Sequence, residues 1–445
     1  MILLQNATLV TAEDVAPGSI LIDGDRIVEV FREDSEGDAA RLAFTLEKNP
    51  GIRVIDLTGR HIIAGGIDAH VHFREPGLTH KADMATESRA AAAGGVTTVF
   101  DMPNTSPATV SARTLADKIS LSKGRCAVNI GFNIGATNEN AEEIIRLVKS
   151  GDPDTGITPD DIASVKIFMG SSTGNMLVDE QETLAKLFSI REKPVMVHCE
   201  DEQTIRTNLQ KAVEKYGDDI PFEEHERIRS RSACIKSSIK ALELAIRCNT
   251  RLTLCHISTA EEIEMVRAAK LSNPDIMAET SCNYLWFSDE DYPRLGSLVK
   301  CNPSVKTPRD RQALRDALKN GLIDTIGSDH APHLLSEKDA PYTKAPSGLP
   351  SIQQTLPVLL TVARQEDIPL TIIASVFSEK AADIYGLKRG KIQKGYFADL
   401  VVFDKDAEFT VKAEDQLSRC GWSPYEGETL TGRITNVFVN GKEIL

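Results

Sequence analysis

The chain has 445 residues, of which 41% are hydrophobic and 26% charged, so its composition is that of an ordinary globular protein. The formal net charge of −14, with no run rich in lysine or arginine, argues against a nucleic-acid partner. The sequence shows neither a signal-peptide pattern nor an apolar run long enough to cross a bilayer, so we expect no membrane partner.

Both ends of the chain predict short β-strands. Residues 1–59 contain apolar and β-branched stretches that are broken by Asp-Gly and Thr-Gly turns. Residues 390–445 show the same pattern of apolar and β-branched stretches separated by turns, with Asn-Gly as a hairpin turn. We expect the two segments to join in one small β-sandwich domain, which flanks a middle segment of different character, residues 60–389.

The middle segment alternates short apolar strands with helical stretches such as residues 80–95 and 140–150. It holds eight strand candidates, at residues 65–73, 96–104, 127–135, 163–170, 193–200, 251–258, 276–285 and 323–332. Eight βα units predict a (β/α)8 TIM barrel, an α/β fold whose active site lies at the carboxyl ends of the strands. The alternation alone also fits a doubly wound open sheet. The positions of the polar residues are therefore needed to distinguish the two folds.

Rare polar residues interrupt or close these apolar strands. His70 and His72 lie two positions apart in the first strand, so both side chains face the same side. His198, His256 and Asp329 close three later strands. A single histidine is more often structural, but four at strand ends are improbable by chance, and imidazole is the commonest ligand of zinc-like ions. The pattern favours the barrel and predicts a metal site at its mouth.

Lys166 lies within the fourth predicted strand, where a buried lysine is costly unless it is paired or modified. It either forms a salt bridge with a neighbouring carboxylate or is carboxylated by CO2, which would make it a long anionic ligand able to bridge two metal ions. Asp329 is either a loop or N-cap aspartate or a metal ligand that also transfers protons. The residues alone leave both pairs of alternatives open.

Five short motifs carry a resemblance to a known family. They are DAHVHFREPG, THKADM, DMPNT, NPSVK and GSDHAPH, which begin at residues 68, 79, 101, 302 and 327. Their combination resembles the amidohydrolase superfamily of metal-dependent hydrolases and, within it, the dihydroorotase family in its carboxylated-lysine branch. The resemblance covers most of the predicted barrel. The stretch SCNYLWFS departs from it, because relatives commonly carry a His-His pair there.

The resemblance implies a binuclear site with two Zn²⁺ ions per chain. Its ligands would be the polar strand residues described above: His70, His72 and Asp329 for the more buried ion, His198 and His256 for the second, and carboxylated Lys166 as the bridge. A hydroxide between the ions would attack the ring amide carbonyl, with Asp329 as acid and base. The implied reaction is the reversible cyclisation of N-carbamoyl-L-aspartate to L-dihydroorotate in de novo pyrimidine biosynthesis.

The resemblance also implies how the substrate is held. Dihydroorotate carries a carboxylate, which a planar guanidinium can grip with two hydrogen bonds. Arg74, Asn104 and His333 would bind this carboxylate, and Asn302 would bind the ring amide. Arg74 could instead form an ordinary surface salt bridge, although it lies two positions past His72 on the same face.

Two other functions stay open on the sequence. Another cyclic amidase, such as a dihydropyrimidinase, hydantoinase or allantoinase, would use the same metal residues, but its neutral substrate would leave Arg74 buried and unpaired. A non-catalytic scaffold of the same superfamily would have lost metal ligands, whereas every ligand position is filled here.

The sequence also bears on cellular location, on assembly and on one loop near the predicted barrel mouth. The eight cysteines are scattered without a Cys-x-x-Cys pair, which predicts free thiols and a cytoplasmic protein. Relatives are commonly homodimers, so a homodimer is one expected assembly. Residues 334–350, rich in Lys, Pro and Gly, are either a mobile loop near the mouth of the barrel or a plain surface loop.

Overall fold

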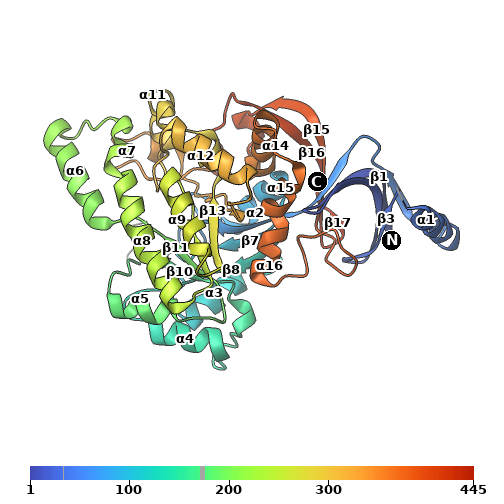
Figure 1. Cartoon of the computed structure of the whole chain (residues 1–445), viewed down its shortest axis with the longest axis horizontal. Coiled ribbons are helices and arrows are strands. Elements are labelled where there is room, and N and C mark those ends of the chain that lie inside the picture. Colours follow the sequence, from blue (N-terminus) through green and yellow to red (C-terminus); the bar gives the residue numbers. More distant parts are fainter. Residues whose placement is uncertain (34, 171–175) are drawn as a thin grey trace.

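A computed structural model describes residues 1–33, 35–170 and 176–445, and it shows a (β/α)8 barrel with a β domain at one side (Figure 1). The fold class predicted from the sequence is confirmed. Both chain termini lie in the β domain, so the two ends of the chain meet there as expected. In the described part of the chain, no helix has the length and apolar character needed to cross a membrane.

Each of the eight predicted barrel positions holds a strand, and the third holds two short pieces. The strands are β6 (Gly66–Val71), β7 (Val96–Asp101), β8 (Asn129–Phe132), β9 (Ile134–Gly135), β10 (Val165–Phe168), β11 (Val195–His198), β12 (Leu252–Leu254), β13 (Ile276–Thr280) and β14 (Thr325–Ile326). They pair in parallel, β6-β7-β8 in one sheet and β9 to β14 in another. The backbone N–H of His72 donates to the carbonyl of His330 at 2.8 Å, which joins the last strand region to the first and closes the barrel.

Helices cover the outside of the barrel (Figure 1). The α-helices after β6 are α2 (Met84–Ala93), α3 (Ala112–Ser122), α4 (Ala141–Ser150), α5 (Gln181–Phe188), α6 (Glu202–Tyr216), α7 (His225–Ile228), α8 (Arg231–Cys248), α9 (Ala260–Lys270), α10 (Cys282–Trp286), α11 (Tyr292–Leu295), α12 (Pro308–Lys319), α13 (Leu335–Lys338), α14 (Thr355–Gln365), α15 (Leu370–Ala374) and α16 (Lys380–Tyr385). The side chains of Asp83 and Thr259 cap α2 and α9 by accepting hydrogen bonds from backbone N–H groups of the first turn. These caps explain why both helices begin where the sequence pattern turns helical.

The β domain is one 8-stranded sheet built from both chain ends. Its strands are β1 (Ile2–Val10), β2 (Val15–Asp23), β3 (Arg26–Arg32), β4 (Arg53–Asp56), β5 (His61–Ala64), β15 (Leu400–Thr410), β16 (Thr429–Val439) and β17 (Lys442–Glu443). The central contact is β5, which pairs with β1 in parallel and with β15 antiparallel. Asn440 and Gly441 have φ angles of 49° and 73°, as a tight hairpin turn between β16 and β17 requires.

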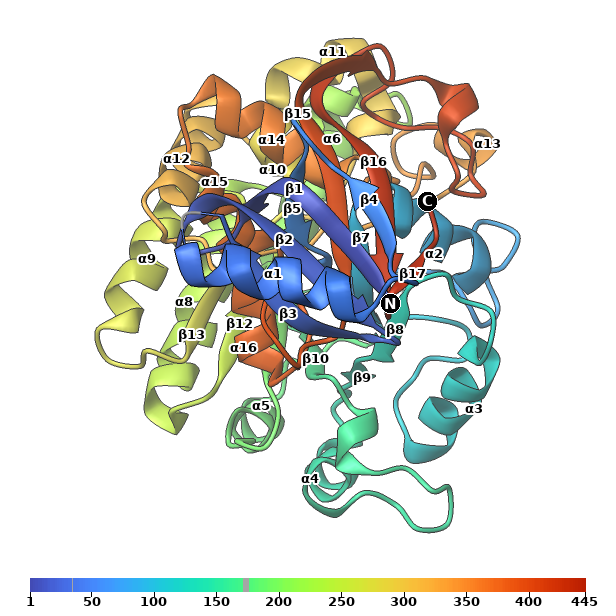
Figure 2. The ribbon, with the colours of Figure 1, turned by 90° about the vertical axis from the view of Figure 1, so that its right-hand side faces the viewer.

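One helix of this domain was not expected from the sequence. Residues 1–59 predicted only strands, but α1 (Glu36–Lys48) lies across the outer face of the sheet (Figure 2). Its Leu42 and Leu46 pack against Leu3 and Phe31. The predicted domain boundary at residue 60 falls just before β5, whose pairing belongs to the β domain.

A buried ion pair fixes the backbone at the mouth of the barrel. Asp101, at the end of β7, accepts a hydrogen bond from the backbone N–H of Phe73 at 2.7 Å and pairs with Lys118 of α3 at 2.7 Å. Both charged side chains are fully buried. Phe73 lies between His72 and Arg74, so this pair holds the strand end that carries two predicted site residues.

Substitution Lys118→Met is expected to lower the free energy of unfolding by about 3–5 kcal/mol, because it leaves Asp101 buried without its counter-charge. Urea unfolding followed by circular dichroism measures this loss. Lys123→Met, at an exposed lysine beyond the end of α3, is the matched control and should stay within about 0.5 kcal/mol of the parent. A loss below about 1 kcal/mol in Lys118→Met would contradict the role given to the pair.

Candidate active site

A pocket at the carboxyl ends of the barrel strands gathers most of the predicted site residues. Its lining consists of His70, His72, Arg74, Lys166, Phe168, His198, His256, Asn302, Asp329, Ala331, Ser347 and Gly348. Of the ten residues predicted for the site, only Asn104 and His333 are outside this lining, and they contact His72 and Arg74 respectively. The barrel therefore brings together side chains that are far apart in the chain, such as Arg74 and His333, which are 259 positions apart.

Three donor atoms meet at one side of the pocket. The Nε2 atoms of His70 and His72 lie 3.4 Å and 3.1 Å from Oδ1 of Asp329. Donor atoms on a tetrahedral zinc ion with bonds of about 2.1 Å are roughly 3.4 Å apart. Both distances are close to this spacing, and ligand atoms of His70, His256 and Asp329 all lie within 4.8 Å of one another.

Two further imidazoles lie next to each other in the pocket. Nδ1 of His198 lies 2.9 Å from Nε2 of His256, and the two rings are nearly perpendicular. Nε2 of His198 is 3.0 Å from the buried carboxylate of Glu200, which favours a proton on that nitrogen. The lone pair on Nδ1 is then directed at His256, an arrangement that a cation between the two rings would stabilise.

Neighbouring oxygens orient the first two histidines in the same way. Nδ1 of His70 donates to Oε1 of Glu279 at 2.8 Å, and Nδ1 of His72 donates to Oδ1 of Asn104 at 2.8 Å. Each of these bonds leaves the lone pair of Nε2 free to point at Asp329. Such outer partners commonly fix the orientation of metal-binding histidines. The resemblance implies that Asn104 binds a substrate carboxylate. That role stays a prediction, in addition to the observed contact with His72.

The protonation states suit metal binding. Burial lowers the pKa of His70, His198 and His256, so these imidazoles are neutral near pH 7, which is the form that binds metals. The pocket therefore offers neutral nitrogen donors and one carboxylate.

Lys166 is fully buried in β10, and its Nζ donates to Sγ of Cys255 at 3.2 Å. Within the described part of the chain, no carboxylate lies within ion-pair distance of this nitrogen. The simpler alternative from the sequence, a salt bridge, therefore has no partner among these residues. A buried ammonium without a counter-charge is costly, so these surroundings do not support the salt-bridge alternative.

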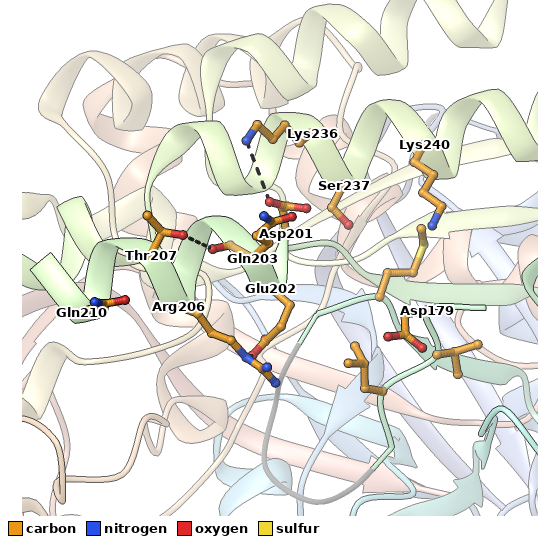
Figure 3. A pocket seen from close by; sticks show the side chains of 13 residues that line it. Asp179, Asp201, Glu202, Gln203, Arg206, Thr207, Gln210, Lys236, Ser237 and Lys240 are labelled. Carbon is orange, nitrogen blue, oxygen red and sulfur yellow. Dashed lines mark hydrogen bonds and ion pairs between the residues drawn. The ribbon is translucent and has the colours of Figure 1, made fainter. Parts of the chain in front are cut away.

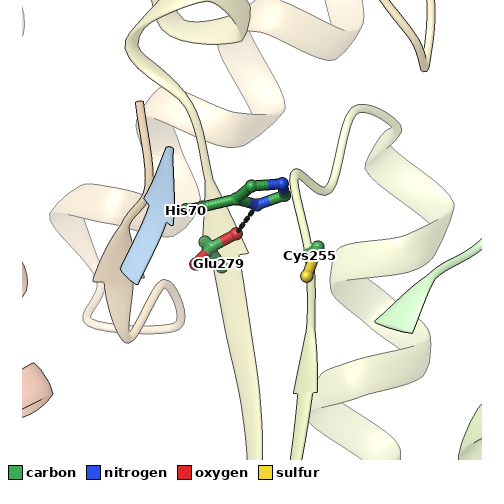
Figure 4. A group of neighbouring side chains, drawn as sticks. All are labelled: His70, Cys255 and Glu279. Atoms are coloured by element: carbon green, nitrogen blue, oxygen red, sulfur yellow. Dashed lines mark hydrogen bonds and ion pairs between the residues drawn. The ribbon is translucent and has the colours of Figure 1, made fainter. Parts of the chain in front are cut away.

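Sequence reasoning missed Glu279 and Cys255, which lie beneath His70 (Figure 4). Together with His70 they offer three buried donor atoms within 4.8 Å of one another, but Nδ1 of His70 is already bonded to Glu279. Burial raises the pKa of Glu279 to about 7 and that of Cys255 to about 12. A charged residue inside the apolar seventh strand was the available signal for Glu279.

Glu200 was also missed, although it lies only two positions past His198, the last residue of β11. It is fully buried between His198 and the guanidinium of Arg229. Burial would raise the pKa of Glu200, but Arg229 and His198 hold it well below its usual range. Glu200 is therefore an anion that holds the ring of His198 in place.

Arg74 is buried, with 3% of its surface exposed, and its backbone has a positive φ of 66°. Its Nε donates to the carbonyl of Pro332 at 3.0 Å, and its Nη2 lies 3.0 Å from Nε2 of His333. Among the residues that the structure describes, no carboxylate is within ion-pair distance of this guanidinium. Burial lowers the pKa of Arg74 to about 10, so the group is still a cation at pH 7.

The backbone is strained at three predicted site residues. Arg74, His256 and Asp329 have φ angles of 66°, 36° and 49°, in the left-handed region that side chains other than glycine seldom adopt. Each such residue costs on the order of 1–3 kcal/mol and persists where the surrounding structure enforces it. Here the strain aims three side chains into one pocket.

Residues 334–350, the mouth segment, form part of the pocket wall. Buried Lys338 donates from Nζ to the carbonyls of Pro346 and Gly348, at 2.9 Å and 3.1 Å. Lys300 donates to two further carbonyls of the same segment. Gly348 has a φ of 142° and would place a Cβ 2.5 Å from the carbonyl of Ala331, so only glycine fits there. The segment is thus held from inside and is not a plain surface loop.

A second cavity, of about 450 Å³, lies beside α6 and α8 (Figure 3). Side chains of both charges line it, among them Lys236 and Asp201, whose Nζ and Oδ1 are 3.9 Å apart. Its lining contains neither a histidine nor any of the predicted site residues. The pocket at the barrel mouth is therefore the candidate active site.

Known proteins resemble this chain over most of its length. Residues 61–444 match the amidohydrolase family. A dihydroorotase of Methanosarcina acetivorans is 33% identical over 438 residues, which cover 95% of this chain and 88% of that protein. An allantoinase of Desulfitobacterium hafniense is 30% identical, covering 100% of this chain and 95% of that protein.

Solved structures show the same likeness. The L-hydantoinase (dihydropyrimidinase) of Arthrobacter aurescens is similar with a TM-score of 0.89 at 26% identity, covering 100% of this chain and 95% of that one. The match to the family extends over most of the chain, and the relatives align along nearly their whole lengths. The chain therefore belongs to the amidohydrolase family, as an enzyme of its cyclic amidase group.

Proposed function

We propose that the protein is a dihydroorotase, which interconverts N-carbamoyl-L-aspartate and L-dihydroorotate in de novo pyrimidine biosynthesis. The observation that carries this proposal is Arg74, a buried guanidinium in the pocket wall with no carboxylate partner among the described residues. A buried cation without a counter-ion is costly, and a substrate carboxylate would supply one. The bidentate geometry of a guanidinium suits this group.

The donor set fits two divalent metal ions, proposed to be Zn²⁺. The ligands would be His70, His72 and Asp329 for one ion, His198 and His256 for the other, and Lys166, carboxylated by CO2, for both. Carboxylation joins the amine nitrogen of Lys166 to the CO2 carbon. Starting from the ammonium form, two protons are released, so an unpaired cation becomes an anion. When bound, such ions polarise a carbonyl oxygen and lower the pKa of water, so that a nucleophile is available at neutral pH.

Side chains of the protein would transfer the proton and bind the ring amide. Asp329 is a carboxylate in the pocket, so it can take the proton of the attacking water during ring opening and return it to the departing ring nitrogen. In the direction of ring closure, Asp329 takes the proton of the attacking nitrogen and gives it to the oxygen that leaves as water. Asn302 lines the pocket with a buried Oδ1 that has no hydrogen-bond partner among the described residues, and it would accept the N–H of the ring amide.

Neutral-ring amidases are the nearest alternative, because proteins named allantoinase and hydantoinase are among the relatives. The metal ligands do not distinguish these substrates. Allantoin and dihydrouracil have no carboxylate, so they would leave Arg74 unpaired. A non-catalytic scaffold is disfavoured because all six proposed ligands lie at the same pocket. We also propose that the protein is cytoplasmic and forms a homodimer.

Ring opening by the zinc-loaded protein tests the proposal directly. L-dihydroorotate, dihydrouracil and allantoin are supplied in parallel, and loss of each ring is followed by ultraviolet absorbance or chromatography. We expect turnover of dihydroorotate alone. Turnover of a neutral ring alone would overturn the substrate assignment while leaving the metal site intact.

Arg74→Met should lower kcat/KM for dihydroorotate by about 10²- to 10³-fold, because a buried charge pair with the substrate is lost. Zinc content, measured by atomic absorption, should not change. Arg89→Met, at an exposed arginine on α2, is the matched control and should keep full activity. Equal losses of metal and activity in Arg74→Met would instead make Arg74 a structural residue.

Lys166→Ala should lose bound metal and lower activity by more than roughly 10²-fold, because the bridging anion is removed. Added acetate or propionate should restore part of both. In the parent protein grown with ¹³CO2, a carbamate carbon should be visible by NMR, and it should be absent from Lys166→Ala. Lys211→Ala, at an exposed lysine on α6, serves as the control. Full activity in Lys166→Ala would rule out the carboxylated lysine.

A further inference from the structure

The ring of His333 lies between two cations and one carbonyl. Nζ of Lys81 is 3.0 Å from Nδ1 of His333. On the other side of the ring, Nη2 of Arg74 and the carbonyl oxygen of Ser347 are 3.0 Å and 3.1 Å from Nε2. Arg74 and Ser347 both line the pocket, so Nε2 is the nitrogen that faces the site.

These contacts cannot all be hydrogen bonds. A neutral imidazole has one N–H donor and one acceptor nitrogen, whereas the ammonium of Lys81 and the guanidinium of Arg74 can only donate. If Nδ1 accepts from Lys81, the proton is on Nε2 and can be donated to Ser347, which satisfies two partners. If Nε2 accepts from Arg74, the N–H of Nδ1 faces the ammonium of Lys81, and Ser347 loses its donor. The first arrangement is therefore the more stable one.

The neutral state of the ring follows from its surroundings. Burial lowers the pKa of His333 far below its usual value, and the nearby charges of Arg74 and Lys81 lower it further. A doubly protonated ring would also leave Nδ1–H facing the ammonium. The remaining variable is which nitrogen carries the single proton.

The position of Lys81 is itself fixed. Its Nζ pairs with Oε1 of Glu337 at 2.9 Å, and Oε2 of Glu337 accepts the backbone N–H of Leu334 at 2.9 Å. The carbonyl of His333 accepts a hydrogen bond from the indole of Trp422 at 2.7 Å. Both the donor and the ring are therefore held from behind, away from the pocket.

We propose that Lys81 is a positioning residue that sets His333 in the Nε2–H form, so that the pocket wall offers a carboxylate two donors. One donor is the N–H of His333 Nε2, and the other is Nη2 of Arg74, which this form leaves without an acceptor on His333. A carboxylate is a stronger acceptor than the carbonyl of Ser347 and would compete for the same proton. This inference rests on the proposed function, because it names the residue that prepares the carboxylate site.

Removal of Lys81 should change which nitrogen of His333 carries the proton. In Lys81→Met the ammonium is gone, and Glu337, whose Oε2 is 3.9 Å from Nδ1, becomes the nearest partner of that nitrogen. The proton should move to Nδ1, and Nε2 should then accept from Arg74. The guanidinium would be tied to the imidazole, and the pocket would lose both free donors.

The first test reads the tautomer without any substrate. The protein is labelled with ¹⁵N-histidine, loaded with zinc, and the His333 signals are assigned by their loss in His333→Gln. We expect a protonated Nε2 in the parent and in Lys81→Arg, and a proton largely on Nδ1 in Lys81→Met. An unchanged tautomer in Lys81→Met would overturn the proposal.

The second test reads substrate binding. Lys81→Met should raise KM for dihydroorotate about 10- to 100-fold, the usual effect of losing a charge-assisted hydrogen bond, with kcat and zinc content little changed. Lys81→Arg should restore KM, and Lys344→Met, at an exposed lysine of the mouth segment, should not alter it. An unchanged KM in Lys81→Met would also count against the inference. If the parent protein does not turn over dihydroorotate, the proposed function fails, while the tautomer measurement still decides the role of Lys81.

Discussion

The structure depends on the burial of charge at the mouth of the barrel. Four imidazoles, the ammonium of Lys166 and the carboxylate of Asp329 meet in one pocket, and a second layer of carboxylates lies behind them. In this low-dielectric setting each polar group needs a partner, because an unpaired one costs several kcal/mol. Most have one, such as Glu279 for His70 and Asn104 for His72. Lys166 and Arg74 have none among the described carboxylates, and the proposed carboxylation of Lys166 and the proposed substrate carboxylate at Arg74 would each supply the missing negative charge.

The β domain and the C-terminal segment contribute to the site through backbone anchoring. Trp422 holds the carbonyl of His333, and the backbone N–H of Arg419 donates to Glu87 at 3.0 Å. Glu87 in turn pairs with buried His330, the residue after Asp329, at 2.7 Å. A segment that is far from the barrel strands in sequence thus helps to fix the loop that carries both a proposed ligand and a proposed substrate donor.

Reaction and selectivity are separated within the pocket. The proposed metal ligands are those that any cyclic amidase of this kind would need, so they fix the type of bond that is broken. The groups around Arg74, which are His333, Lys81 and Ser347, are those proposed to bind or prepare the site for a substrate carboxylate. A substitution there is expected to change substrate preference while the metal centre is kept.

The sequence by itself determined the order of strands and helices and the side of each strand that carries a histidine. Alternation within a strand is a local property, so His70 and His72 could be assigned to one face, and the eight strand positions could be read without contacts. It did not predict α1, because the packing of Leu42 and Leu46 on the sheet is tertiary. It also did not reveal the partners of the site residues. Glu279 lies 209 positions from His70, and Lys81 lies 252 positions from His333, so only closure of the barrel brings them together. Tertiary structure decided these pairings, because a hydrogen bond depends on position in space, whereas a sequence pattern records only position along the chain.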